Sequence, residues 1–237
     1  MRKLLLLAFL AVGMTANAEN IVTNDDEDQI ENTGGVKIGK GKDDDDRWSM
    51  HFAVGVDIPT GVPDGVEFAP FRSWEINWTV VQYDYTPGKS NTTLSAGLGL
   101  NWRNYTLSGH KKGFFKVNDV VGIAEVGNEY DDFSSNIRTT ALTMPLLVKQ
   151  KFSKSFAVSV GAQLNWNFYA RIHNYVEQGD HETDDYTKKI GQRPITVDVL
   201  GMVHFGDFAI YCKYSPMSVL KKDRGVEFKS LAVGFYF

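Results

Sequence analysis

The sequence is poor in three features that often assign a protein class at once: cysteine, long apolar runs and excess positive charge. Cys212 is the only cysteine among 237 residues, so no disulfide forms within the chain. No apolar run approaches the ~20 residues that a transmembrane helix needs. The formal net charge is −4, which provides no basic surface for nucleic acid. These absences argue against disulfide-stapled, helical membrane and nucleic-acid-binding proteins.

The N-terminus, residues 1–18, has the pattern of a cleavable signal peptide. Arg2 and Lys3 precede a short apolar segment, and residues 16–18 read Ala-Asn-Ala, which fits the small-x-small cleavage rule. The apolar segment is short for the alternative, a retained helical anchor. We therefore expect a secreted mature chain that begins at Glu19.

An acidic arm, residues 19–47, follows the leader. It carries two acidic runs, 25–28 and 43–46, and no periodic apolar pattern. Such a composition buries too little apolar surface to offset chain entropy, so we expect disorder. A weak calcium site on the four-aspartate run is the alternative, although its spacing does not match an EF-hand loop.

From Trp48 onward, apolar and polar residues alternate with the period of a β-strand. In Phe156–Phe168 every even position is apolar, and every odd position is small or polar. In a soluble sandwich the apolar face would pack on a second sheet, whereas in a membrane barrel it faces lipid. The same alternation recurs in segments that begin near residues 48, 74, 92, 142, 195, 208 and 229. Together these make eight candidate strands.

The connections between these strands alternate in length. Ser153-Lys154, Gly206-Asp207 and the turn 86–91 are short, whereas long polar segments occupy residues 59–71, 106–137, 170–192 and 218–225. Bacterial barrels have short periplasmic turns and long outer loops. We therefore predict an all-β, eight-stranded antiparallel up-and-down transmembrane barrel over residues 48–237, with both mature termini in the periplasm. Phe114–Val126 also has strand character, and if this segment enters the membrane with a partner strand the barrel has ten strands.

Aromatic residues gather at the ends of the predicted strands, as expected where rings lie at lipid headgroups. The long-loop girdle would hold Trp102, Tyr105, Trp166, Phe168 and Tyr169, and the short-turn girdle Trp48, Phe152, Phe156, Phe205, Phe208 and Phe235–Phe237. Val81, Tyr83 and Tyr85 run out of phase with Trp74–Val80. Either a β-bulge or an inward tyrosine pair would explain the shift.

The chain ends on Phe237, which closes the strand Val233-Gly234-Phe235-Tyr236-Phe237. This ending resembles the C-terminal signal that the barrel-assembly machinery recognises in outer-membrane barrels. The segment Leu142–Phe152, with Pro145, resembles the proline-containing strand of PorT-type outer-membrane barrels of Bacteroidota. The resemblance implies a Gram-negative outer membrane and its lipids as surroundings, and it offers a secretion role by analogy with the founding PorT protein.

Several ionisable side chains are expected to face the lumen of the barrel. Glu75 and Arg103 fall at similar height on adjacent strands, and so do Asp198 and Lys213. Buried charges of mixed sign are expected to pair, since a lone buried charge is very costly. The alternative is a narrow polar pore. The full predicted network is His51, Glu75, Arg103, Lys149, Asp198, Lys213, Glu227 and Lys229.

No spacing in the sequence indicates a Ser/His/acid catalytic set, a standard metal site or a cofactor site, and we expect none of the three. A group of loop residues could in principle bind a metal, but a solvated loop is the favoured interpretation. These residues are His173, His181, Glu182, Asp184 and Asp185. We expect a non-enzymatic barrel with a structural, surface-interaction or membrane-assembly role, meeting a protein partner through 106–137 and 170–192. A small-solute channel, a secretion accessory and a lipid-modifying enzyme are the alternatives.

Overall fold

The computed structural model describes residues 36–40, 46–109, 111–127, 131–179 and 181–237, with side chains from Trp48 onward. The predicted signal peptide and most of the predicted acidic arm lie outside these residues. Within the described ranges, no helix is long and apolar enough to cross a membrane.

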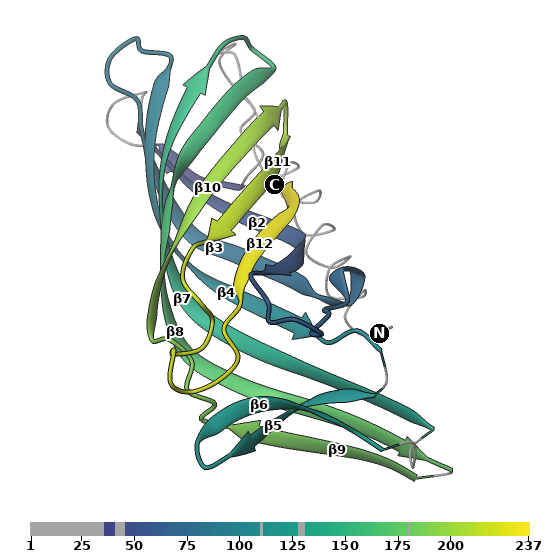
Figure 1. Ribbon diagram of the computed structural model, residues 1–237. Coiled ribbons are helices and arrows are strands. Elements are labelled where there is room, and N and C mark those ends of the chain that lie inside the picture. Colours follow the sequence, from purple (N-terminus) through teal and green to yellow (C-terminus); the bar gives the residue numbers. More distant parts are fainter. Residues whose placement is uncertain (1–35, 41–45, 110, 128–130, 180) are drawn as a thin grey trace.

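Eight antiparallel strands form a closed ring, as the alternation predicts (Figure 1). The ring order is β2-β12-β11-β10-β8-β7-β4-β3, and β3 pairs back onto β2 to complete it. Closure leaves the barrel strands without a free edge within the wall. The strands are β2 (Asp46–Thr60), β3 (Trp74–Tyr85), β4 (Thr92–Thr106), β7 (Asp132–Lys151), β8 (Phe156–Gln178), β10 (Ile195–Phe205), β11 (Phe208–Ser215) and β12 (Lys229–Tyr236).

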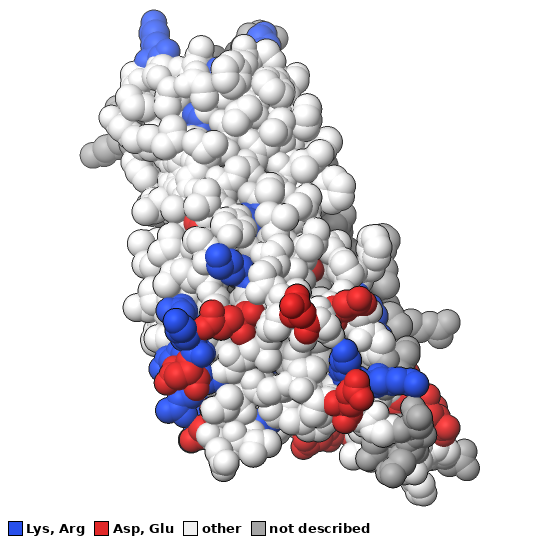
Figure 2. All heavy atoms as spheres, in the orientation of Figure 1, with Lys and Arg blue, Asp and Glu red and all other residues white. Residues whose placement is uncertain are grey.

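The barrel is apolar outside and polar inside, the reverse of a soluble protein. Val160 is 58% exposed and Leu98 50% exposed on the outer face, whereas Asp198 and Gln163 in the lumen are fully buried. Figure 2 shows a wide band almost free of Lys, Arg, Asp and Glu around the middle of the visible face, with charges gathered at the long-loop end. The period-2 pattern therefore assigns the two faces as predicted.

The long segments 106–137 and 170–192 are largely strand, which corrects their prediction as loops. β7 and β8 continue beyond the ring, and β9 (His181–Lys188) pairs with the extended part of β8. β5 (Lys112–Val117) and β6 (Val120–Glu125) form a separate two-stranded sheet, so the hairpin at 114–126 does not enter the ring. Eight strands is therefore the correct count. We call the extended parts of β7 and β8, with β5, β6 and β9, the outer module.

The β5–β6 hairpin turns through Asn118 and Asp119, which both have positive φ, 49° and 63°. A two-residue type I′ hairpin turn requires positive φ at both central residues, and Asn and Asp adopt this conformation more readily than most residues. Lys116 forms an ion pair with Asp119 at 2.7 Å. This hydrogen bond and charge lower the pKa of the Asp119 carboxyl.

A hydrophobic core lies at the long-loop end, where the outer module meets the loops. Loop 218–228 joins it from the opposite wall, and a short 3-10 helix, η2 (Pro70–Arg72), covers the entry to β3. The core consists of Tyr105, Leu107, Phe114, Val121, Ile137, Ala170, Ile172, Ile190, Leu220 and Phe228. Tyr105 is completely buried there, so its predicted place in the aromatic girdle is wrong.

The structure decides between the two explanations of the change of phase in β3. The register of β3 shifts between Thr79 and Val81 against β4, and between Thr79 and Gln82 against β2, which marks a β-bulge at Val80. After the bulge Gln82 is buried and Tyr85 is exposed, so the bulge, and not an inward tyrosine pair, explains the change of phase.

The segment 19–47 is not wholly irregular, contrary to the sequence prediction. Residues 36–40 form strand β1 (Val36–Lys40), which pairs with the start of β2 through Val36 and Met50. β2 itself begins at Asp46, two residues before the predicted start of the barrel. β1 lies on the side of β2 that β12 occupies further along, because Phe52 bonds the last residue, Phe237.

Closure between the first and last barrel strands depends on two facing glycines, Gly55 and Gly234. A Cβ on Gly234 would collide with the backbone of Val54 and Gly55. We expect Gly234→Ala to lower the free energy of unfolding by about 1–3 kcal/mol, the usual cost of overpacking. Urea titration of the refolded barrel in detergent micelles measures this. Gly201→Ala is the control because a Cβ there meets nothing within 4 Å, and equal losses in both variants would contradict the argument.

Candidate functional site: the polar lumen and its two ends

The middle of the lumen holds an ion-pair network that crosses the barrel. Arg103 on β4 lies beside Glu75 on β3, with Nε 2.8 Å from Oε2. The other Glu75 oxygen lies 2.7 Å from the Lys213 ammonium on β11, and the Tyr211 hydroxyl donates to it at 3.1 Å. β3 and β11 are separated by two strands in the ring, so these contacts join distant parts of the wall.

The same guanidinium bonds the opposite side of the lumen. One terminal nitrogen of Arg103 lies 2.5 Å from Asp198 Oδ2 on β10, and the other donates to the Ser215 hydroxyl at 3.1 Å. Ser215 and Asn165 in turn donate to the two oxygens of Asp198. Two cations therefore face two carboxylates in the buried interior, and Ser215, Asn165 and Tyr211 donate further hydrogen bonds to the carboxylate oxygens. This arrangement lets a charged cluster persist in a barrel interior.

Sequence reasoning left several members out of this network. Asp57 is fully buried and accepts a hydrogen bond from the Ser230 hydroxyl. Gln163 accepts from Asn77 at 3.1 Å and donates to Asn165 at 2.8 Å, which links β3 to β8. The available signal was parity, because each of these residues lies at an inward position of its strand. The predicted network contained only ionisable residues, so it lacked the amide side chains, and it also lacked Asp57.

Four of the eight predicted network residues do not join the central cluster. His51 and Lys149 line a separate cavity at the short-turn end. Glu227 and Lys229 are exposed, which corrects their predicted inward position. Glu227 and Lys229 have odd numbers, like the outward Leu231, whereas the even positions Phe228 and Ser230 are buried. The alternation along the strand therefore places both charges outside.

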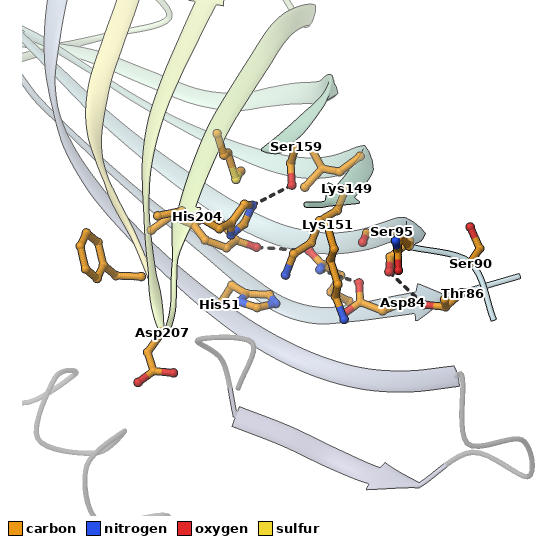
Figure 3. Close-up of a pocket in the computed structure, with 18 of the residues that line it drawn as sticks. His51, Asp84, Thr86, Ser90, Ser95, Lys149, Lys151, Ser159, His204 and Asp207 are labelled. Atoms are coloured by element: carbon orange, nitrogen blue, oxygen red, sulfur yellow. Dashed lines mark hydrogen bonds between the residues drawn. The ribbon is translucent and has the colours of Figure 1, made fainter. Parts of the chain in front are cut away.

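The cavity at the short-turn end has a volume of about 230 Å³ (Figure 3). His51 and His204 lie on one side of it, and Lys149 and Lys151 reach into it from β7, while the Asp207 side chain points away. The His51 ring stacks on Tyr236 at 4.8 Å, and its Nδ1 lies 3.2 Å from the carbonyl oxygen of the C-terminal residue, Phe237. The site is therefore cationic and lies beside the end of the chain.

The cavity also contains a serine–histidine pair that sequence reasoning missed. Ser159 Oγ lies 2.7 Å from His204 Nε2. Within the described chain, no carboxylate holds the other side of this imidazole. Ser159 also has strand partners on both sides, Met202 and Lys149, so the backbone N–H groups around it are committed to the sheet. A hydrolase needs an oriented base and an oxyanion hole, and neither is assembled around this pair.

Two apolar layers separate these sites from each other and from the outside. Between the cavity and the charged network lie Ala53, Leu147, Leu200, Met202, Ala209, Tyr211, Ala232 and Tyr236. The hydrophobic core of the outer module covers the other end. A second cavity beside Arg103 measures about 20 Å³, room for about one water molecule. In the described part of the chain, apolar side chains and the charged network therefore lie between the short-turn cavity and the outer module.

The outer-module residues considered as metal ligands form other contacts. His173 Nε2 lies 2.6 Å from Asp184, and the His173 ring stacks on Tyr186 at 4.7 Å. Among the residues that the structure describes, no three His, Cys, Asp or Glu side chains are grouped closely enough to hold a metal ion.

Comparison with known proteins adds little to this geometry. No protein-family model and no curated protein matches the chain, so the resemblance to PorT-type barrels gains no support. Among solved structures, the chain is similar to Ail, the attachment invasion locus protein of Yersinia pestis, at 11% identity, over 80% of this chain and 97% of that one. The TM-score is 0.31, so the assignment of the fold rests on the strand pairing of this chain alone.

Arg103 is the residue on which the central network depends, since among the described residues it is the one cation that forms ion pairs with both Glu75 and Asp198. Arg103→Met would leave these carboxylates short of one buried cation, so we expect the free energy of unfolding to fall by about 3–5 kcal/mol. Urea titration in detergent micelles measures the loss. Arg224→Met removes an exposed arginine whose contact with Asp119 is 3.6 Å, and should cost less than about 1 kcal/mol. Adding Asp198→Asn should recover part of the Arg103 loss, and similar losses for both arginines would contradict the assignment.

Proposed function

We propose that this protein is a closed, non-conducting and non-enzymatic outer-membrane barrel that presents its outer module to a macromolecular partner. The observation that carries the proposal is that the outer module is a folded structure, with its own buried core, built onto a barrel whose outer face is apolar.

The apolar outer face supports a membrane location. Large apolar side chains stand exposed on every barrel strand, and polar ones fill the interior. A closed β-barrel is one of the two structures that satisfy all backbone groups in a bilayer. Exposed rings mark both ends of the band, among them Trp166 and Phe168 near the outer module, and Phe152 and Phe156 near the short turns. By the length rule for bacterial barrels, the short turns and Phe237 would then be periplasmic.

Hydrogen bonds hold the β5–β6 hairpin against the extended parts of β7 and β8 and against the loop before β12. The Ser135 hydroxyl donates to Asn174 at 2.6 Å, and Asn174 donates to the carbonyl of Phe114 at 3.1 Å. The backbone of Val121 bonds that of Arg224 in the loop before β12. Strands β5 and β6 are thus fixed from both sides. Binding residues are commonly found on connections that a rigid scaffold positions, and this arrangement supports a surface-interaction role.

The side chains that fill the lumen of the described barrel predict electrical silence. Purified protein inserted in planar lipid bilayers should give no stepwise currents at any applied voltage, because the hydrophobic core, the charged network and the inner apolar layer lie in series along the lumen. A porin reconstituted in the same way shows that insertion works. Regular single-channel steps from this protein would favour the small-solute channel instead.

The tip of the outer module is the place to test display and binding. Tyr175 and Asp184 face each other across β8 and β9, so residues 175–184 can be replaced by a short epitope tag without touching the buried core. We expect antibody to label this tag on intact cells and not one inserted at the turn Gly206-Asp207. The tagged variant should also behave like a gene deletion when surface and secreted proteins are profiled.

Heat-modifiable mobility, in which boiled and unboiled samples are compared on SDS gels, checks that the tagged barrel still folds. Labelling of the Gly206-Asp207 tag on intact cells would reverse the proposed orientation. A tip variant that fully complements the gene deletion would refute binding through β8 and β9. A change confined to secreted proteins would favour the secretion role that the PorT resemblance implies.

A further inference from the structure

A row of three cations crosses the outer face of the extended strands β7, β8 and β9. Arg138 pairs with Arg171, and Arg171 pairs with Lys188, so the three stand opposite one another on adjacent strands. Side chains directly opposite in an antiparallel pair share a face. Ile137 and Ile172, next to the two arginines in sequence, belong to the hydrophobic core of the outer module, so the row lies on the opposite, outer face. We call these three residues the cation row.

A row of three carboxylates crosses the same face near the tip. Asp132 pairs with Glu177, and Glu177 pairs with Glu182. From Arg171 to Glu177 is three same-face steps along β8, about 20 Å of strand. Since β8 and β9 extend away from the ring (Figure 1), the cations lie nearest the barrel wall and the carboxylates farthest from it. The two rows are therefore too far apart to neutralise each other.

The described contacts of the cation row are with neutral groups. Arg138 Nε donates to the amide oxygen of Asn104 at 3.1 Å. The guanidinium carbon of Arg171 lies 4.7 Å from the centre of the Tyr186 ring, and Lys188 is exposed. These contacts orient the cations without cancelling their charge.

The row has an electrostatic need for an anion. Like charges directly opposite each other destabilise a sheet. The acidic residue of this face that follows the row along β9 is Asp184, and its carboxylate lies 2.6 Å from His173 Nε2. An anion that touches adjacent strands would offset the repulsion within the row. A guanidinium group binds phosphate or carboxylate through two parallel hydrogen bonds, which makes it suited to either.

The height of the row on the barrel decides which anion it meets. The next pair on this face toward the ring is Thr140 and Tyr169, and beyond it lies Trp166, an exposed ring of the apolar band. Two same-face steps are about 13 Å of strand, or roughly 10 Å of height at the usual tilt of a barrel strand. The headgroup layer of a bilayer extends about 5–8 Å beyond the hydrocarbon, and long arginine side chains can bend toward it. The cation row is therefore within reach of lipid headgroups.

We propose that the cation row binds the phosphate group of an anionic lipid in the leaflet next to the outer module. The inference rests on the membrane placement of the proposed function. The phosphate oxygens accept hydrogen bonds from Arg138 and Arg171, and the acyl chains of the same lipid lie against the apolar band below. The carboxylate row stands about 20 Å further along the strand, where the phosphates do not repel it.

Lipid selectivity in detergent micelles tests the proposal. The mature chain is refolded in dodecyl maltoside, and native mass spectrometry measures the dissociation constants of dioleoyl phosphatidic acid and dioleoyl phosphatidylcholine, which share their acyl chains. We expect phosphatidic acid to bind at least tenfold more tightly, because each cation beside an anionic headgroup contributes roughly fivefold. Equal dissociation constants for the two lipids would overturn the proposal, whatever the variants do.

Two triple variants assign the selectivity to the row. R138Q/R171Q/K188Q should lose the preference for phosphatidic acid. K154Q/K221Q/K222Q removes the same charge from exposed lysines elsewhere and should keep it. Heat-modifiable mobility shows whether each variant folds. Equal effects of the two triple variants would mean that net charge, and not the row, selects the lipid, and would contradict the proposal.

Two further measurements separate geometry from charge and lipid from free phosphate. R138K/R171K keeps both charges but loses the guanidinium forks, so it should bind phosphatidic acid more weakly than the wild type. Inorganic phosphate in large excess should leave phosphatidic acid bound to the wild type. Displacement of the lipid would show that the row takes soluble phosphate, and would overturn the lipid assignment.

Failure of this inference is distinguishable from failure of the proposed function. A barrel that is labelled at its tip on intact cells but shows no lipid preference would refute the role of the cation row and leave the proposed function in place. A chain that stays folded and monomeric without detergent or lipid would refute the membrane placement, and both proposals with it.

Discussion

Hydrogen-bond closure of one sheet onto itself is the constraint on which the rest of this structure depends. Each of the eight barrel strands pairs on both sides, and the pairing of β3 with β2 removes the last free edge. Once the ring is closed, strand geometry leaves two surfaces for side chains, an outer one and a lumen. The apolar residues occupy the outer surface, so the chain has to fill its interior with polar groups that satisfy one another. Gly55 and Gly234 show how tight this closure is, because neither position has room for a Cβ.

The interior meets that demand in layers. Arg103 and Lys213 neutralise Glu75 and Asp198 at mid-height, and Asn165, Ser215 and Tyr211 complete the hydrogen bonds. An apolar layer around Met202 and Tyr236 then separates this network from the cavity at the short turns. Buried charges of this kind are weak evidence for stability, but removal of one partner is costly. They are well suited to fixing one register of a barrel, since a one-residue slip would turn every charge toward the outside.

The two ends of the barrel differ in kind. One end carries the outer module, in which Phe114 and Ile172 are buried as deeply as in a soluble domain. The other end carries short turns, the C-terminal residue and the cationic cavity. The first end is the surface that we propose contacts a macromolecular partner. The second is a pocket lined by histidines and lysines, on the far side of the inner apolar layer. The barrel wall between them holds both in place without connecting them.

Alternation alone determined the barrel wall. Period 2 in segments such as Phe156–Phe168 is a local property, so the sequence was enough to assign eight strands, their outward faces and the short turns. The same rule applied consistently places Glu227 and Lys229 outside and adds the inward Asp57 to the lumen charges.

Only the tertiary structure decided the contacts across the lumen and the form of the long segments. Arg103 meets Asp198 because closure brings β4 and β10 to face each other, and no spacing along the chain encodes that. Residues 106–137 and 170–192 looked like loops because β9 is exposed and polar on both faces and shows no alternation. β9 is a strand because the extended β8 offers it an edge, and such pairing depends on the partner strand more than on local sequence.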